Sequence, residues 1–592
     1  MKRVAAIIVM CVSLVLLALI CLPLLLSSDY VKTRVEQKLA ELTGRTVILN
    51  GDSSLSFSPY LGVTYGNVTI LGEKDSEVPL MTADELGARL SLLSAIWGEA
   101  QIADLELTRP RFNLVVDENG ARNWIKPDGP LLRRFNVPAG SLPAYHLGTL
   151  TFREGIVSYT DMETGSAVEI SSVSGEIEWA DTNSVFTMNS EGIWNGERVS
   201  LYAIFDDLEG LLRGGRSVVS IALNTNPGSL EYSGSLINTG DVSLDGELTF
   251  ASSAPHRLAE WLNRRLPIAS VLGAIRLSGR AVGPLHMVRF EDASLTLADQ
   301  SATGQLQITD TEDRILSLNG TLAFDTLRLP DLGMPFLQDS RPDAEDMVWK
   351  LSLFEGLRAD LRISANSATS GSVEITELAA SLTASQKGFR FEVGHSRALG
   401  GRITGSVSFG EADADDIELV ANLSQIQLER LFAPISDSTL TISGEGNGRI
   451  SLLRSEQVQP PTLTGSMKMK SPSGTLNGFS LETLLESGTI ANPASSDTIM
   501  LGSTSYTDLE IDARLEGRNI IVDAGKFLSD GGKVVAAGRA NAQAGTLALR
   551  GMASKGEEGS EAVTFFVGGT PQAPLFVVTP GNGLPPVAPQ SQ

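Results

Sequence analysis

The chain has 592 residues, of which 42% are hydrophobic and 6% aromatic, so it is long enough for several domains and folded rather than disordered. Its formal net charge of -24 at pH 7 leaves no basic footprint for nucleic-acid phosphates and argues against broad adsorption to anionic membrane surfaces. Nucleic acid is therefore excluded as a partner.

An uncharged run from Val4 to Leu26 follows Met1-Lys2-Arg3. As a helix, this run would measure roughly 35 Å, enough to cross a bilayer. The pattern predicts a transmembrane anchor over residues 1–28, which crosses a bilayer through residues 4–26 and keeps Lys2 and Arg3 cytoplasmic. A cleaved signal peptide is the alternative, although Leu24-Leu25-Leu26-Ser27-Ser28 lacks the usual small-residue cleavage site.

The two cysteines, Cys11 and Cys21, both lie in this apolar run. A chain without other thiols avoids stray disulfides, which favours export to an oxidising compartment such as the bacterial periplasm. Chance depletion of cysteine is the alternative.

A short amphipathic helix is expected after the anchor. Asp29 can cap it, and Gly44 is placed to end it. Val31, Val35, Leu39 and Leu42 form one apolar stripe, which either packs onto its own domain or lies on the membrane surface.

From Thr46 onward the hydrophobic period is mostly two, as in Phe112, Leu114 and Val116. Such alternation predicts strands with one buried and one solvated face, and the regular turn residues favour antiparallel meanders. The expected fold is therefore mainly β. Short helices are expected over Ser91–Glu99, Arg257–Leu266, Leu428–Phe432 and Leu481–Glu486.

Three further segments complete the expected organisation. Residues 136–425 are expected to form a middle β-repeat region, and residues 426–578 a C-terminal region. Residues 579–592, rich in Pro, Gly and Gln, are expected to be a disordered tail.

No constellation for catalysis, metal or cofactor binding is visible in the sequence. The histidines, His146, His256, His286 and His395, have no metal-ligand spacing. Residues 444–448 are glycine-rich and are expected to form a turn, because a strand rather than a helix follows them. The acidic residues 411–416 are interpreted as a solvated loop. An envelope enzyme acting on polysaccharide would need paired carboxylates in a cleft, which sequence cannot show.

Several motifs occur in an order that resembles the AsmA-like family of bacterial envelope proteins. The anchor is followed by Leu42-Thr43-Gly44-Arg45, Pro59-Tyr60-Leu61-Gly62 and the Arg109-Pro110 strand, and the middle and C-terminal regions resemble the family too. The motif residues are Gly44, Arg45, Gly51, Pro59, Gly62, Pro110, Gly120, Asn123 and Trp124. The resemblance assigns residues 29–135 to the family's N-terminal region.

This resemblance implies a non-enzymatic protein, anchored in the inner membrane with its β-rich body in the periplasm, that supports outer-membrane biogenesis. It implies an elongated, curved sheet whose apolar groove carries phospholipid, and a protein partner in the periplasm or outer membrane. The candidate groove residues are Phe112, Leu114, Val116, Leu361, Ile363, Val373 and Ile375. The alternative is a scaffold or regulator of outer-membrane protein assembly, in which the apolar face packs against a second sheet and binds no lipid.

Overall fold

The computed structural model shows a mainly β protein that divides into two compact units. Unit 1 comprises residues 1–263 and 274–290, and unit 2 comprises residues 264–273 and 291–592. The described residues are 33, 36–37, 39–40, 45–56, 61–72, 78–90, 102–118, 122–123, 148–163, 165–180, 184–239, 241–311, 313–330, 351–410, 416–432, 440–455, 462–487, 496–541, 544–555, 562–570 and 573–580.

In unit 1 β1 and β2 both pair with β3, and the strands from β7 onward pair in chain order. Its elements are β1 Val47–Leu49, β2 Ser53–Ser56, β3 Leu61–Ile70, β4 Met81–Leu90, β5 Ile102–Thr108, β6 Arg111–Val116, β7 Thr149–Asp161, β8 Ser166–Glu178, β9 Phe186–Trp194, β10 Glu197–Phe205, α5 Leu208–Leu212, β11 Arg216–Thr225, β12 Gly228–Asn238, β13 Val242–Ser252, α6 Pro255–Trp261 and β14 Ile275–Pro284. Pairing is antiparallel except that β5 and β6, two parts of one interrupted strand, run parallel to β7.

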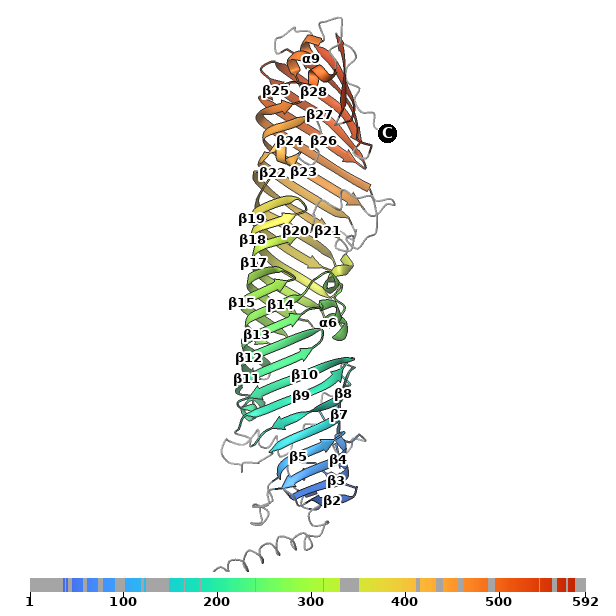
Figure 1. Cartoon of the computed structure of the whole chain (residues 1–592), viewed down its shortest axis with the longest axis vertical. Helices are drawn as coiled ribbons and strands as arrows, with labels where there is room; N and C mark the ends of the chain where they lie inside the picture. Colours follow the sequence, from blue (N-terminus) through green and yellow to red (C-terminus); the bar gives the residue numbers. More distant parts are fainter. Residues whose placement is uncertain are drawn as a thin grey trace, which may run out of the picture. The chain divides into compact units, whose positions relative to one another are not determined.

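Unit 2 is also built mainly from strands that follow one another in chain order, as Figure 1 shows. Its elements are η1 Pro267–Ser270, β15 Met287–Leu297 (mostly in this unit), β16 Gln300–Asp310, β17 Leu316–Leu329, η3 Leu351–Phe354, β18 Leu357–Ser370, β19 Val373–Ser385, β20 Gly388–Ala398, β21 Gly401–Phe409, β22 Ile417–Gln427, α8 Leu428–Leu431, β23 Thr441–Ser455, β24 Thr462–Asn477, α9 Leu481–Ser487, α10 Ser496–Met500, β25 Ser503–Tyr506, β26 Asp508–Glu516, β27 Asn519–Ser529, β28 Gly532–Asn541, β29 Thr546–Ser554, β30 Val563–Gly569 and β31 Pro574–Pro580. β17 and β18 pair in parallel, and the ladders from β18 to β31 are antiparallel.

The N-terminal core supports one of the two interpretations of the amphipathic helix. Residues 33, 36–37 and 39–40 are helical, and Leu39 is buried with Leu49, Val63 and Tyr65. Leu39 therefore packs onto its own domain. Val31, Val35 and Leu42 lie outside the described residues, as do residues 4–26. Within the described part of the chain, no helix is both long and apolar enough to cross a membrane.

The expected short helices are largely found. Leu428–Phe432 and Leu481–Glu486 correspond to α8 and α9 within one residue, and Ser91–Glu99 lies outside the described residues. The expected helix Arg257–Leu266 is wrong at both ends, because α6 covers Pro255–Trp261. Pro255 fits the first helical turn, where no amide donor is needed, and Asn263 leaves the helical conformation with φ of 51°.

The expected turn at residues 444–448 is wrong, because these residues lie inside β23. A register shift falls between Glu445 and Asn447, so the glycines belong to a β-bulge. Gly444 has φ of 131°, and a Cβ atom there would lie 2.7 Å from the Tyr506 hydroxyl oxygen. Glycine is therefore needed because the bulge and the tyrosine leave no room for a side chain.

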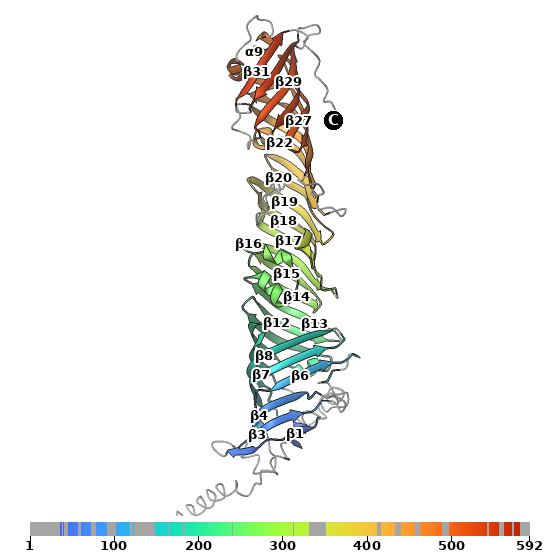
Figure 2. The ribbon, with the colours of Figure 1, turned by 90° about the vertical axis from the view of Figure 1, so that its right-hand side faces the viewer.

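The C-terminal part of unit 2 holds the largest hydrophobic core among the described residues. Leu481, Leu484 and Leu485 of α9 and Ile499 of α10 pack with Phe576 of β31. Figure 2 shows α9 beside β29 and β31, with which it is in contact. Short helices thus cover one face of the last strands.

Candidate functional site

Strand register in unit 2 gathers apolar residues into rows that cross many strands. Residues paired across neighbouring strands point to the same face of a sheet. One such row, from β16 to β31, is Gly304, Leu322, Ile363, Ala380, Val393, Gly405, Ala421, Ile450, Met467, Ala513, Val522, Gly538, Leu549, Val567 and Phe576.

A second apolar row lies two residues along the strands and on the same face. It runs from β16 to β26 through Leu306, Gly320, Leu361, Leu382, Phe391, Val407, Leu419, Leu452, Gly465 and Leu515. Neither row contains a charged side chain. We call the surface formed by these two rows the apolar face of unit 2.

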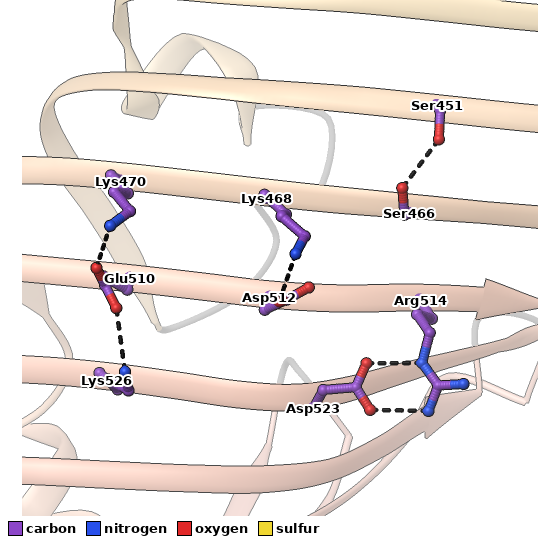
Figure 3. A network of polar contacts seen from close by, with 9 residues as sticks. All are labelled: Ser451, Ser466, Lys468, Lys470, Glu510, Asp512, Arg514, Asp523 and Lys526. Atoms are coloured by element: carbon purple, nitrogen blue, oxygen red, sulfur yellow. Dashed lines mark hydrogen bonds and ion pairs between the residues drawn. The ribbon is translucent and has the colours of Figure 1, made fainter.

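The row between them points to the opposite face and is mostly polar. It contains Gln305, Thr321, Arg362, Ser381, Glu392, Ser406, Val420, Ser451, Ser466 and Arg514. Figure 3 shows part of this outer face, where Glu510 lies between Lys470 and Lys526 and Asp523 accepts two hydrogen bonds from Arg514, of 2.7 and 2.8 Å.

The outer-face ion pairs favour the charged forms of their acids. The hydrogen bond from the Arg514 guanidinium lowers the pKa of the Asp523 carboxyl, and hydrogen bonds from Lys470 and Lys526 lower that of Glu510. Lys468 adds a further pair with Asp512 at 3.2 Å. This face is therefore suited to water, and the opposite face is not.

The apolar face is only partly covered by the protein itself. Ile363, Val393, Ala421 and Ile450 are half-buried although each has a strand on both sides. Short helices pack at places along the face, such as Leu353 and Phe354 of η3 against Phe389 and Phe409. The half-buried stretch is the part that remains open to a ligand.

Two hollows of about 270 Å³ each lie on unit 2. The first hollow is lined by residues of β17–β22, including Val373, Ile375, Val393 and Ala421. The second hollow is lined by residues of β23–β29, including Ile511 and Leu549. A buried cavity of about 150 Å³ lined by apolar side chains is large enough to bind benzene. Each hollow is thus large enough for a segment of hydrocarbon chain.

The structure places the sequence-predicted groove residues in both units. Leu361 and Ile363 lie on the apolar face of unit 2, and Val373 and Ile375 line the first hollow. Phe112, Leu114 and Val116 lie on β6 of unit 1, where Phe112 packs against the N-terminal core and Val116 is buried. The sequence analysis did not single out Val393, Ala421 and Ile450. The alternation of apolar and polar residues within β20, β22 and β23 is the signal that could have identified them.

Unit 1 has its own apolar row, on a separate set of strands. It runs from β7 to β14 through Leu150, Ile177, Met188, Ala203, Ile221, Tyr232, Leu248 and Gly279. The neighbouring row of opposite parity contains Glu176, Asn189, Glu231 and Ser278. The two-faced pattern is therefore a property of each unit.

The motif residues that the structure describes hold the N-terminal strands together. The Asn123 side chain donates to the Asn113 carbonyl at 2.8 Å and accepts from the Val115 amide at 2.9 Å, while the Arg45 guanidinium donates to the Asn123 carbonyl. A Cβ atom on Gly51 would lie 2.5 Å from the Gly66 carbonyl oxygen. These roles are structural.

Pro110 and Gly62 complete the described motif. Pro110 lies between β5 and β6, and its carbonyl oxygen accepts a hydrogen bond from the Ile156 amide. A Cβ atom on Gly155 would lie 3.0 Å from the Pro110 ring. Gly62 lies in β3 opposite Ser56 and Arg89. Gly44, Pro59, Gly120 and Trp124 lie outside the described residues.

Tyr65 in this core carries a testable pH dependence. Its hydroxyl is buried without a hydrogen-bond partner among the described residues, and burial followed by the charge of Glu36 raises its pKa to about 12. Between pH 10 and 12 the tyrosine ionises in the unfolded chain but stays mostly neutral in the folded protein. The free energy of unfolding, which is at its full value below pH 10, should therefore fall by about 2 kcal/mol as the pH rises to 12.

We expect Tyr65→Phe to abolish this part of the alkaline loss while leaving stability at pH 7 equal or slightly higher, because it removes an unsatisfied hydroxyl. Denaturant unfolding of both proteins between pH 7 and 12 measures the difference. An identical alkaline loss in both proteins contradicts the assignment.

The fold defines the chain as a β-sheet protein in which each unit has one apolar face and one ionic face. Residues 1–166 match the sequence model of the AsmA family, so the N-terminal region of the chain is similar to that family. No curated protein and no solved structure matches the chain.

Proposed function

We propose that this protein is a non-enzymatic carrier of phospholipid acyl chains, anchored in the inner membrane by residues 4–26 with its bulk in the periplasm. The observation that carries the proposal is the half-buried apolar face of unit 2, which crosses many strands without a charged residue. Its role would be to support outer-membrane biogenesis.

The physical argument concerns the cost of exposing hydrocarbon to water. Each exposed CH₂ group costs about 0.8 kcal/mol, so an acyl chain needs a continuous apolar surface to cross an aqueous space. Rows in register on neighbouring strands provide one, because the strands lie about 4.8 Å apart and each contributes an apolar side chain. A headgroup would remain in water, since the apolar rows offer it no charged partner.

The alternative function is a scaffold for outer-membrane protein assembly with no lipid cargo. The hydrophobic core beneath α9 and α10 is the observation that favours it, because there the apolar face is filled by the protein's own helices. The half-buried stretch of β18–β23 favours the lipid carrier instead.

Photo-crosslinking in the full-length chain tests the proposal. A photoreactive phenylalanine analogue at Val393, which lines the first hollow, is expected to crosslink radiolabelled phospholipid in intact bacterial envelopes. The matched control is the same analogue at Glu392, the preceding residue, which points to the outer face and is exposed. Equal labelling at both positions, or none at Val393, would overturn the lipid-carrier proposal and leave the scaffold.

A further inference from the structure

The outer face of unit 2 changes character at its last four strands. Across β24–β27 it carries the ion pairs of Figure 3. Across β28–β31 it carries exposed apolar residues instead: Met552 is 45% exposed, Phe566 38%, Leu575 60% and Val577 56%. Large apolar side chains gathered on a solvated sheet face commonly mark an interaction site.

Register shows that these residues are neighbours. Arg550, Phe566 and Val577 form one outward row across β29, β30 and β31. The adjacent outward rows contribute Arg539 and Leu575 on one side and Val535 and Met552 on the other. We define the terminal patch as Lys533, Val535, Arg539, Arg550, Met552, Phe566, Leu575 and Val577.

The charge of the terminal patch is opposite to that of the chain. Lys533, Arg539 and Arg550 are exposed, and strands β28–β31 contain no Asp or Glu, whereas the chain has a net charge of -24. No ion pair to these three side chains is found among the described residues. Asp530, in the turn before β28, is exposed and is the acidic residue nearest in sequence to Lys533, whereas Glu557, Glu558 and Glu561 of the β29–β30 connection lie outside the described residues.

We propose that the terminal patch docks on an anionic phospholipid surface. Aliphatic and aromatic side chains interleaved with arginine and lysine favour the membrane interface, because the apolar groups enter the headgroup boundary while the cations pair with lipid phosphates. The acidic remainder of the chain is repelled by the same surface, which restricts contact to this face. The chain then has a membrane contact on unit 2 that is separate from the expected anchor and independent of any lipid in the apolar face.

The test uses the full-length chain in nanodiscs of phosphatidylcholine and measures its capture by vesicles. Vesicles with 30 mol% phosphatidylglycerol in phosphatidylcholine are expected to capture the nanodiscs, and pure phosphatidylcholine vesicles are not. Each arginine near an anionic surface contributes about fivefold in affinity, so Arg539→Glu with Arg550→Glu should weaken capture at least tenfold. Raising the salt concentration should weaken capture of the unaltered chain.

Two variants make the result specific to the terminal patch. Arg358→Glu with Arg362→Glu makes the same charge change on the outer face of β18 and should leave capture unchanged. Leu575→Ser with Val577→Ser removes apolar contacts at the edge strand and should weaken capture without altering net charge. Equal capture by both vesicle types, or equal weakening by the β18 control, overturns the proposal. It is likewise overturned if the patch variants leave capture intact but dissociate a dimer in mass photometry, which assigns the patch to a second copy.

Discussion

Replacing Ile363 with aspartate is expected to remove lipid from the apolar face of unit 2. Ile363 pairs with Ala380, which pairs with Val393, so the new carboxylate lies two strands from the crosslinking position, at about 10 Å. An ionised carboxylate left among acyl chains without a partner costs several kcal/mol. Lipid crosslinking at Val393 should therefore fall at least about tenfold.

The matched control for this variant is Ser364→Asp, the same substitution one residue further along β18. Ser364 pairs with Ala379 and points to the opposite face, so lipid labelling should remain within about twofold of the unaltered chain. Ile363→Val keeps the site apolar and separates loss of lipid from loss of packing. If both aspartate variants reduce labelling equally while remaining folded, the two faces are not distinct in lipid binding.

Truncating Leu484 should have the largest effect on stability. Leu484 is fully buried in α9, in the core that also contains Phe479, Ile499 and Phe576. Removing a leucine side chain from such a core loses its burial and leaves a cavity, so Leu484→Ala should destabilise this region by about 2–5 kcal/mol. Hydrogen exchange of β30 and β31, followed by mass spectrometry, measures the local free energy of opening.

The control for Leu484→Ala is Leu501→Ala, in the turn between α10 and β25. Leu501 is 87% exposed, so its truncation should change local stability by less than about 0.5 kcal/mol. Because α9 is a single short helix that fills the apolar face here, loosening it should also admit ligand beneath β29 and β31. Unchanged exchange in β30 and β31 on truncating Leu484 would show that α9 is not part of their core.

The strands were predictable because their signal is local. Alternation at Leu361 and Ile363, or at Val373 and Ile375, indicates which face of one strand is apolar, because successive side chains of a pleated strand point to opposite faces. The AsmA-family match over residues 1–166 agrees with the motif residues identified in the sequence. The expected boundaries near residues 135, 425 and 578 stay predictions, whereas the compact units divide near residues 263–291.

Bulges and special backbone conformations were not predictable from the pattern. Asn67, Arg109, Glu154 and Ser172 have positive φ in or beside β3, β5, β7 and β8, and register shifts interrupt β7 and β8 there. Arg109 also pairs with Asp84 at 2.7 Å across this region. No residue type among these requires a positive φ, so the bulges depend on the neighbouring strands.

The sequence by itself determined that the protein is mainly β, that its strands are two-faced and that its N-terminal region is AsmA-like, since each of these follows from residues close together in the chain. Only the tertiary structure decided which strands lie side by side and which of their residues share a face. Strand register placed Ile363, Val393 and Ile450 in one apolar row, and gathered Arg539, Arg550 and Val577 on the outer face. A shift of one residue in any pairing would move that strand's apolar side chains to the other face, and register depends on contacts between strands far apart in sequence.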